Sequence, residues 1–149
     1  MSHLWLFLHF VGFTAWLGGG FASMVAGIAG GKESRAGLGA VVRAQTAIQK
    51  RIIAPGAILV VLSGLMLTIG MMNAMMTALS PWLMVMQGAG LLGALVTLLG
   101  GLPIASRLAR LDPEGQHAAH FDELRNRQRM VASVAGTLAL LALVAAAMM

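Results

Sequence analysis

Long stretches without a single charged residue constrain the fold of this chain more than any other feature. Residues 1–31, 52–106 and 130–149 contain no Lys, Arg, Asp or Glu. A helix needs about 20 apolar residues to span a bilayer, so these stretches hold one, two and one spans. The middle stretch must therefore be a hairpin of two helices. Its turn is expected between Asn73 and Pro81, where Asn, Thr, Ser and Pro collect.

The composition excludes an ordinary soluble domain. Of the 149 residues, 58% are hydrophobic and 10% are charged, whereas about 25% charged residues are usual in soluble domains. We therefore predict an all-α fold, an integral membrane four-helix bundle that forms a single domain. The four spans are expected at about residues 4–30, 52–72, 81–105 and 130–148.

All ten basic residues lie in two connecting segments. They are Lys32, Arg35, Arg43, Lys50 and Arg51 in the first, and Arg107, Arg110, Arg125, Arg127 and Arg129 in the second. Connections rich in Lys and Arg stay in the cytoplasm, so we expect both termini on the non-cytoplasmic side of a bacterial inner membrane. The net charge of +5 is then an orientation signal. The expected partner is the lipid bilayer and not nucleic acid. A homo-oligomer or a larger membrane complex is also compatible with so small a bundle.

Both basic connections are predicted to be largely helical. Residues 34–50 contain no Pro and should extend the second span, with a kink at Pro55. Asp112 is expected to cap a helix that has Pro113 in its first turn. Residues 117–129 should lead as helix into the fourth span, with their charges forming a solvated surface.

His9 is the only titratable side chain well inside a predicted span. On a helical wheel it shares a face with Gly12, Trp16 and Gly20, so it is expected to point into the bundle. A polar group at that depth needs a partner. Two interpretations stay open: a neutral imidazole that is hydrogen-bonded within the bundle, or a group that binds a ligand or carries a proton.

Met86 is the natural counterpart of His9, because it lies at the same depth in the third span. Two ligand-capable side chains, each beside a strip of glycines, suit a flat macrocycle between two helices. His/Met ligation of haem iron has precedent. We therefore predict a cofactor site for haem b formed by His9, Met86, Trp16, Trp82, Gly20, Gly90 and Gly93.

A methionine cluster marks the end of the second span. The string MMNAMM contains Met71, Met72, Met75 and Met76. Thioether sulfur together with imidazole selects Cu(I), so these four residues with His9 and Met86 form a predicted metal site. The alternative interpretation is flexible apolar packing at a helix end. Cysteine is absent, which excludes disulfides and thiolate metal sites.

The opening HLWLFLHFVGFTAWLGGG resembles the first helix of a set of small bacterial four-helix membrane proteins. That set includes the membrane protoporphyrinogen IX oxidase family and the membrane domain of the copper-resistance D family. The resemblance rests on the aromatic-rich start, His9, and Trp16 followed by small residues. A basic first loop, a Pro near the start of the second span and PW at the start of the third extend it along the chain.

The resemblance also implies roles for individual residues. In the oxidase family, the His equivalent to His9 is regarded as a haem ligand, paired with a Lys four residues after the Trp of the third span. Here Met86 stands at that Lys position, four residues after Trp82. The oxidase activity is therefore not carried over to this chain, and an axial Met would preserve the ligand geometry.

Together these observations predict an inner-membrane protein that binds a b-type haem and has an electron-transfer or haem-handling role. No side chain is assigned a catalytic role, and any enzyme activity would be that of an oxidoreductase. Copper handling or transport at the periplasmic face is one alternative. A cofactor-free accessory subunit or scaffold of a membrane complex is another.

Overall fold

The computed structural model describes the backbone of residues 2–74 and 81–148, and the side chains of 3–70 and 81–148. Within these ranges the chain is helical and contains no strand. It forms four helical rods that are long and apolar enough to cross a membrane, over residues 3–30, 35–70, 81–108 and 115–147. The predicted all-α architecture with four such helices is confirmed.

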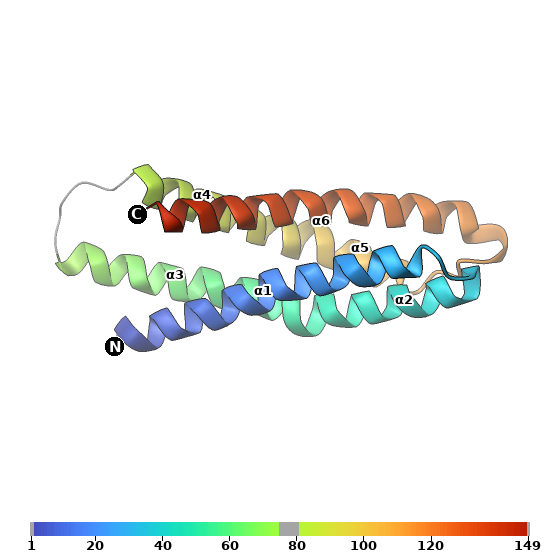
Figure 1. Ribbon diagram of the computed structural model, residues 1–149, viewed down its shortest axis with the longest axis horizontal. Coiled ribbons are helices and arrows are strands. Elements are labelled where there is room, and N and C mark those ends of the chain that lie inside the picture. The colour runs from blue at the N-terminus through green and yellow to red at the C-terminus, as the bar shows by residue number, and fades with distance from the viewer. Residues whose placement is uncertain (1, 75–80, 149) are drawn as a thin grey trace.

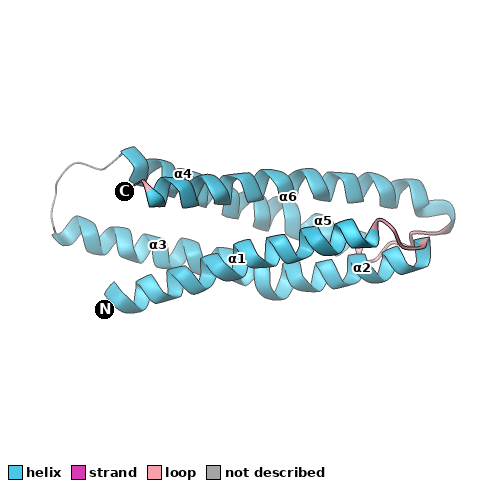
Figure 2. Ribbon diagram, in the orientation of Figure 1, coloured by secondary structure: helices cyan, strands magenta, loops and turns pink. Residues whose placement is uncertain are grey.

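The rods are built from shorter helical segments joined end to end, with loops only at the ends of the rods (Figure 2). In chain order the segments are α1 (Ser2–Gly30), α2 (Arg35–Ile48), η1 (Gln49–Ile53), α3 (Ala54–Ala74), α4 (Pro81–Leu95), η2 (Val96–Gly101), α5 (Leu102–Leu108), η3 (Gly115–His117) and α6 (Ala118–Ala147). The second rod starts at residue 35, so the predicted helical extension of the second span is confirmed.

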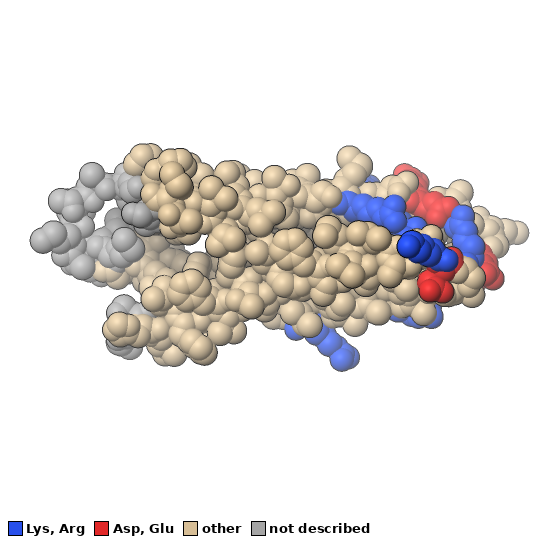
Figure 3. Space-filling view, viewed as in Figure 1, with Lys and Arg blue, Asp and Glu red and all other residues tan. Residues whose placement is uncertain are grey.

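The rods pack as two antiparallel pairs (Figure 1). α1 lies mainly against α3, and α4 lies mainly against α6. The first turns of α1 and the last turns of α6 are at the same end of the bundle. Lys, Arg, Asp and Glu gather toward the opposite end (Figure 3), which we call the charged end.

Two glycines bring α1 and α3 into direct backbone contact. A Cβ on Gly56 would lie 2.8 Å from the carbonyl oxygen of Gly12 and 2.8 Å from the amide nitrogen of Trp16. In turn, a Cβ on Gly12 would lie 3.0 Å from the Gly56 oxygen. No hydrophobic force draws helices together inside a bilayer, so such close approach of small residues provides much of the packing energy.

Both η1 and η2 are π-helical, and each ends just before a proline. Pro55 follows η1 and Pro103 follows η2. In a regular α-helix a proline ring clashes with the carbonyl four residues earlier, which here belongs to Arg51 or Leu99. A wider π turn at that carbonyl relieves the clash without breaking the helix. At Pro55, where a kink is predicted, the structure has a π-helical segment.

The second basic connection differs from its prediction. Asp112 does not cap a helix: its Oδ1 accepts a hydrogen bond from the Glu114 amide at 3.0 Å and closes a turn, and helical structure begins at Gly115. An aspartate two residues before a free amide forms such a turn readily. Asp122 forms a two-pronged ion pair with Arg35 of α2 at 3.0 and 2.9 Å, and both side chains stay exposed. This pair raises the pKa of the Arg35 guanidinium.

Candidate functional site

His9 points into the bundle, but toward α3 and not toward α4. The imidazole is partly buried, and its Nδ1 lies 3.1 Å from the carbonyl oxygen of Val60 and 3.1 Å from Oγ of Ser63. Its Cε1 lies 3.2 Å from where a Cβ on Gly64 would be. The missing side chain of Gly64 therefore makes room for the ring.

The contact with Val60 determines which nitrogen of His9 carries the proton. A carbonyl oxygen only accepts, so Nδ1 must be the donor, and a neutral ring then has its lone pair on Nε2. No group in the described parts of the chain hydrogen-bonds Nε2. Histidines that bind metals often have this arrangement, with one nitrogen fixed by a carbonyl and the other free to bind. It also satisfies the other interpretation, an imidazole hydrogen-bonded within the bundle.

The glycines predicted to make room for a macrocycle fall into two groups. Gly93 is filled, since a Cβ there would lie 3.0 Å from the Trp16 ring and 3.2 Å from Cβ of Leu138. Gly12, on the same face as His9, is filled by the backbone of α3. Gly20 and Gly90 have nothing within 4 Å. The space is therefore not continuous along the face on which His9 lies.

The other predicted ligand-site residues are not gathered around His9 by any described contact. Met86 is partly buried on α4, and Trp82 is 41% exposed at the start of that helix. Trp16 is buried, and its Nε1 donates a hydrogen bond to Thr97 Oγ1 at 3.2 Å. Trp16 of α1 therefore contacts Gly93 of α4 and Thr97 of η2. These contacts connect the two helix pairs.

The four clustered methionines of the predicted copper site lie outside the described side chains. This holds for Met71 and Met72 at the end of α3 and for Met75 and Met76 beyond it. Within the described residues, no group of three or more His, Cys, Asp or Glu side chains could hold a metal ion.

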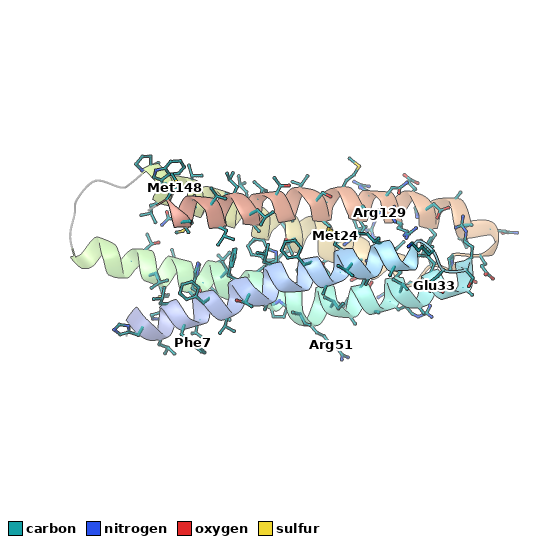
Figure 4. The ribbon with its side chains drawn as sticks, in the orientation of Figure 1. Phe7, Met24, Glu33, Arg51, Arg129 and Met148 are labelled. Atoms are coloured by element: carbon teal, nitrogen blue, oxygen red, sulfur yellow. The ribbon has the colours of Figure 1, made fainter. Side chains whose placement is uncertain are left out.

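A cavity of about 660 Å³ lies between α1 and α6, with α2, η1, η2 and α5 behind it. Its volume is in the range usual for ligand sites. We call it the α1–α6 groove. Three of its lining residues, Phe21, Met24 and Leu140, are 48%, 54% and 42% exposed, so it opens at the surface of the bundle. Figure 4 labels Met24 and Arg129, which line it from α1 and α6.

The groove ends against the apolar core in the middle of the bundle. Trp16, Ile53 and Ala139 line the groove and also belong to the buried cluster that includes Ala57 and Val60. Neither His9 nor Met86 is among the described lining residues. This cluster separates the groove from the His9 side chain, which contacts α3 at Val60 and Ser63.

Most polar groups on the back wall of the groove already have protein partners. Gln45 Nε2 donates to the Ser23 carbonyl at 2.7 Å. Thr46 Oγ1 lies 3.1 Å from the Ala105 carbonyl, to which it can donate. The hydroxyl of Thr97 donates to the Gly93 carbonyl at 2.8 Å. These groups bind the wall together, and they leave little hydrogen-bonding capacity for a ligand.

The polar groups at the charged end of the groove are different. Arg125 Nη2 and Gln128 Oε1 are buried, and neither has a hydrogen-bond partner among the described residues. Arg129 lies one turn from Arg125 on α6 and also lines the groove. A buried polar group without a partner costs free energy and calls for an explanation.

The charge at this end of the groove has one sign. No Asp, Glu or His occurs among the described lining residues, which include Arg125 and Arg129. Asp122, which lies on the preceding turn of α6, is paired with Arg35. The arrangement suits a molecule with an apolar body and an anionic group.

The sequence-based prediction missed the groove, although one signal in the sequence points to it. Gln45 and Gln49 are four residues apart and therefore share a helix face. Val42 and Thr46 are buried close to that face, so this part of α2 packs inside the protein. The arginines of residues 117–129 are predicted to lie on a solvated surface. Residue spacing within one helix does not show where the neighbouring helix leaves a cavity.

Comparisons with family models, with curated proteins and with solved structures find no match for this chain. The resemblance of the opening helix to the oxidase and copper-resistance sets therefore stays a prediction based on the residues quoted for it.

Proposed function

We propose that the charged end of the bundle faces the cytoplasm of a bacterium and that both termini are on the opposite side of the inner membrane. The support is the segregation of Lys and Arg (Figure 3). Arg51 and Arg129 directly precede the uncharged stretches of the second and fourth rods. They would lie at the level of the cytoplasmic head groups, and the helices on the far side of them would extend into the cytoplasm.

We further propose that the protein binds an amphipathic anion in the α1–α6 groove and acts as a membrane-embedded binding protein for it. The observation that carries this proposal is the groove itself: apolar walls, an opening at the bundle surface, and an unpaired guanidinium nitrogen of Arg125 at its charged end. Hydrogen bonds between guanidinium and an anionic oxygen are the strong class of such bonds. An anionic group placed there would satisfy the buried donor.

Two kinds of membrane molecule share this chemistry. An anionic lipid has a phosphate above acyl chains, and haem has propionates on an apolar macrocycle. Both could enter sideways from the bilayer, since the groove opens beside Phe21 and Met24. Native mass spectrometry and an absorption spectrum of the same purified sample distinguish the two.

The test compares the wild type with a variant that carries both Arg125→Gln and Arg129→Gln. Arg127→Gln is the matched control, because Arg127 is exposed on the same helix and does not line the groove. The wild type and the control should retain an anionic amphiphile through purification in mild detergent. Retention by the double variant should fall about tenfold, given about 1.5–3 kcal/mol for hydrogen bonds to charged groups. Equal retention by all three proteins would contradict the proposal.

Haem binding at His9 is a second proposal, favoured by the hydrogen bond that fixes Nδ1 and leaves Nε2 as a potential ligand. The donor set fits one axial position, and Met86 is the predicted second ligand. The filled positions at Gly12 and Gly93 do not favour a ring between α1 and α4. A Soret band that is lost in His9→Ala, and kept when Arg125 and Arg129 are changed, would support haem at His9. No such band after haem loading would exclude it.

Copper handling by the methionine cluster, and a role as a cofactor-free accessory subunit, also remain proposals. Metal analysis of protein from copper-supplemented cells tests the first. Copper retained equally after Met71, Met72, Met75 and Met76 are changed to Leu would argue against that site. Purified protein without colour, metal or amphiphile would favour the accessory subunit.

A further inference from the structure

The uncharged part of the α1–α6 groove has about the length of one leaflet of a bilayer. Along α6 the lining runs from Arg125 to Leu140, and its part from Arg129 to Leu140 corresponds to about 16 Å at 1.5 Å per residue. Half of the hydrocarbon core of a bilayer is about 15 Å. Since Arg129 directly precedes the uncharged stretch, this part of the groove would begin at head-group level and end near the bilayer midplane, at the core around Trp16, with Arg125 among the head groups.

We infer that the ligand is an anionic phospholipid of the cytoplasmic leaflet, held in the orientation that it already has in the bilayer. Its phosphate would lie against Arg125 and Arg129, with one acyl chain along the groove toward Trp16. This inference rests on the function proposed above and specifies the class of ligand.

The charges around the head-group position predict selectivity among lipids. The described lining offers two guanidinium groups and no carboxylate, and Asp122 is occupied by Arg35. A phosphatidylglycerol head group would be attracted by the arginines, with no carboxylate among the described lining residues to oppose it. The quaternary ammonium group of phosphatidylcholine would be repelled by the same positive groups.

The walls of the groove favour an acyl chain over a macrocycle. Haem proteins hold the iron through side-chain ligands such as His, Met or Cys. Met24 offers the one sulfur among the described lining residues, and that side chain is 54% exposed. A chain that lies along Gly20, Ala132 and Gly136 needs apolar contact only, which these small residues permit.

The experiment uses the full chain in mild detergent, with Trp5→Phe and Trp82→Phe introduced so that Trp16 is the one fluorescent indole. Phosphatidylglycerol or phosphatidylcholine, brominated along the acyl chain, is added in near-stoichiometric amounts, because bromine quenches an indole only on close contact. Phosphatidylglycerol should quench Trp16 at about tenfold lower concentration than phosphatidylcholine. That preference should vanish when Arg125 and Arg129 are both Gln, and it should persist in Arg127→Gln.

Equal quenching by the two lipids in the wild type would overturn the inference, because it would show unselective boundary lipid. Haemin provides the arm that separates the two proposals. If haemin binds with a new absorption band and phosphatidylglycerol does not displace it, the lipid assignment is wrong while the proposed anion site stands. If neither phosphatidylglycerol nor haemin binds, both proposals fail.

Discussion

Glycine has opposite effects at two places in the bundle. At the contact between α1 and α3, Gly12 and Gly56 bring the two backbones so close that neither helix has room for a Cβ. At the wall of the α1–α6 groove, Gly20 and Gly136 face open space. The same residue type therefore closes one contact and leaves the other region open. What separates the cases is whether a second backbone lies opposite the glycine.

The largest effect of a substitution is expected at the contact between Gly12 and Gly56. In Gly56→Ala, the new methyl group would meet backbone atoms of Gly12 and Trp16 at 2.8 Å, and backbone cannot move aside as a flexible side chain can. We expect a loss of about 3 kcal/mol in stability, at the upper end of the usual cost of overpacking. Thermal unfolding in detergent measures it. Gly90→Ala is the control, since Gly90 has nothing within 4 Å and the change should be nearly silent.

Added bulk at the wall of the α1–α6 groove should weaken ligand binding and leave the stability of the protein unchanged. Gly20→Leu places a side chain at the wall of the groove, where a Cβ meets nothing within 4 Å. Retention of the amphiphile should fall about tenfold, or about 1.4 kcal/mol, with an unchanged unfolding temperature. Gly18→Leu is the matched control, because Gly18 is equally open and does not line the groove. Equal loss in both variants would show that lipid-facing bulk alone causes the effect.

The core at the inner end of the groove can be tested at Trp16. Trp16→Phe keeps an aromatic ring and removes the indole N–H that donates to Thr97, which should cost about 1 kcal/mol. Thr97→Val removes the same bond from the other side. If the bond links the two helix pairs, the double variant should be less destabilised than the sum of the single variants. Simple additivity would mean that the two residues act separately.

The smallest effect is expected at the charged end. Asp122→Asn weakens the pair with Arg35, in which both side chains are largely solvent-exposed. Exposed ion pairs contribute little and are screened by salt. The unfolding temperature should drop slightly at low ionic strength, and the difference should disappear at high salt. A large drop that salt does not reduce would show that this pair holds the helices at the charged end together.

Much of the fold could be predicted because the bilayer allows few solutions. Uncharged stretches of sufficient length must be helices, and the helical extension at residues 34–50 is indicated by the absence of Pro. The pairing of α1 with α3 could not be predicted in this way. His9 and Gly12 define an inward face, but the sequence does not say which helix covers it. The prediction placed the third span, which begins with α4, against this face. The side chain of His9 instead contacts α3, which belongs to the second span.

The candidate site was harder to predict for a similar reason. The residues that stand out in the sequence are potential ligands, namely imidazole and thioether groups. The groove is instead defined by what α1 and α6 fail to fill, together with Arg125 and Gln128 at its end. A void is a property of several helices at once. Each of its lining residues is ordinary when only the helix that carries it is considered.

The backbone contact between Gly12 and Gly56 also determines how much space is left on the other side of α1. α1 packs most extensively against α3 and has few contacts with α6. With no Cβ between the backbones at Gly12 and Gly56, α1 lies as close to α3 as two helices can come. The groove is therefore the space that this close pairing leaves between α1 and α6.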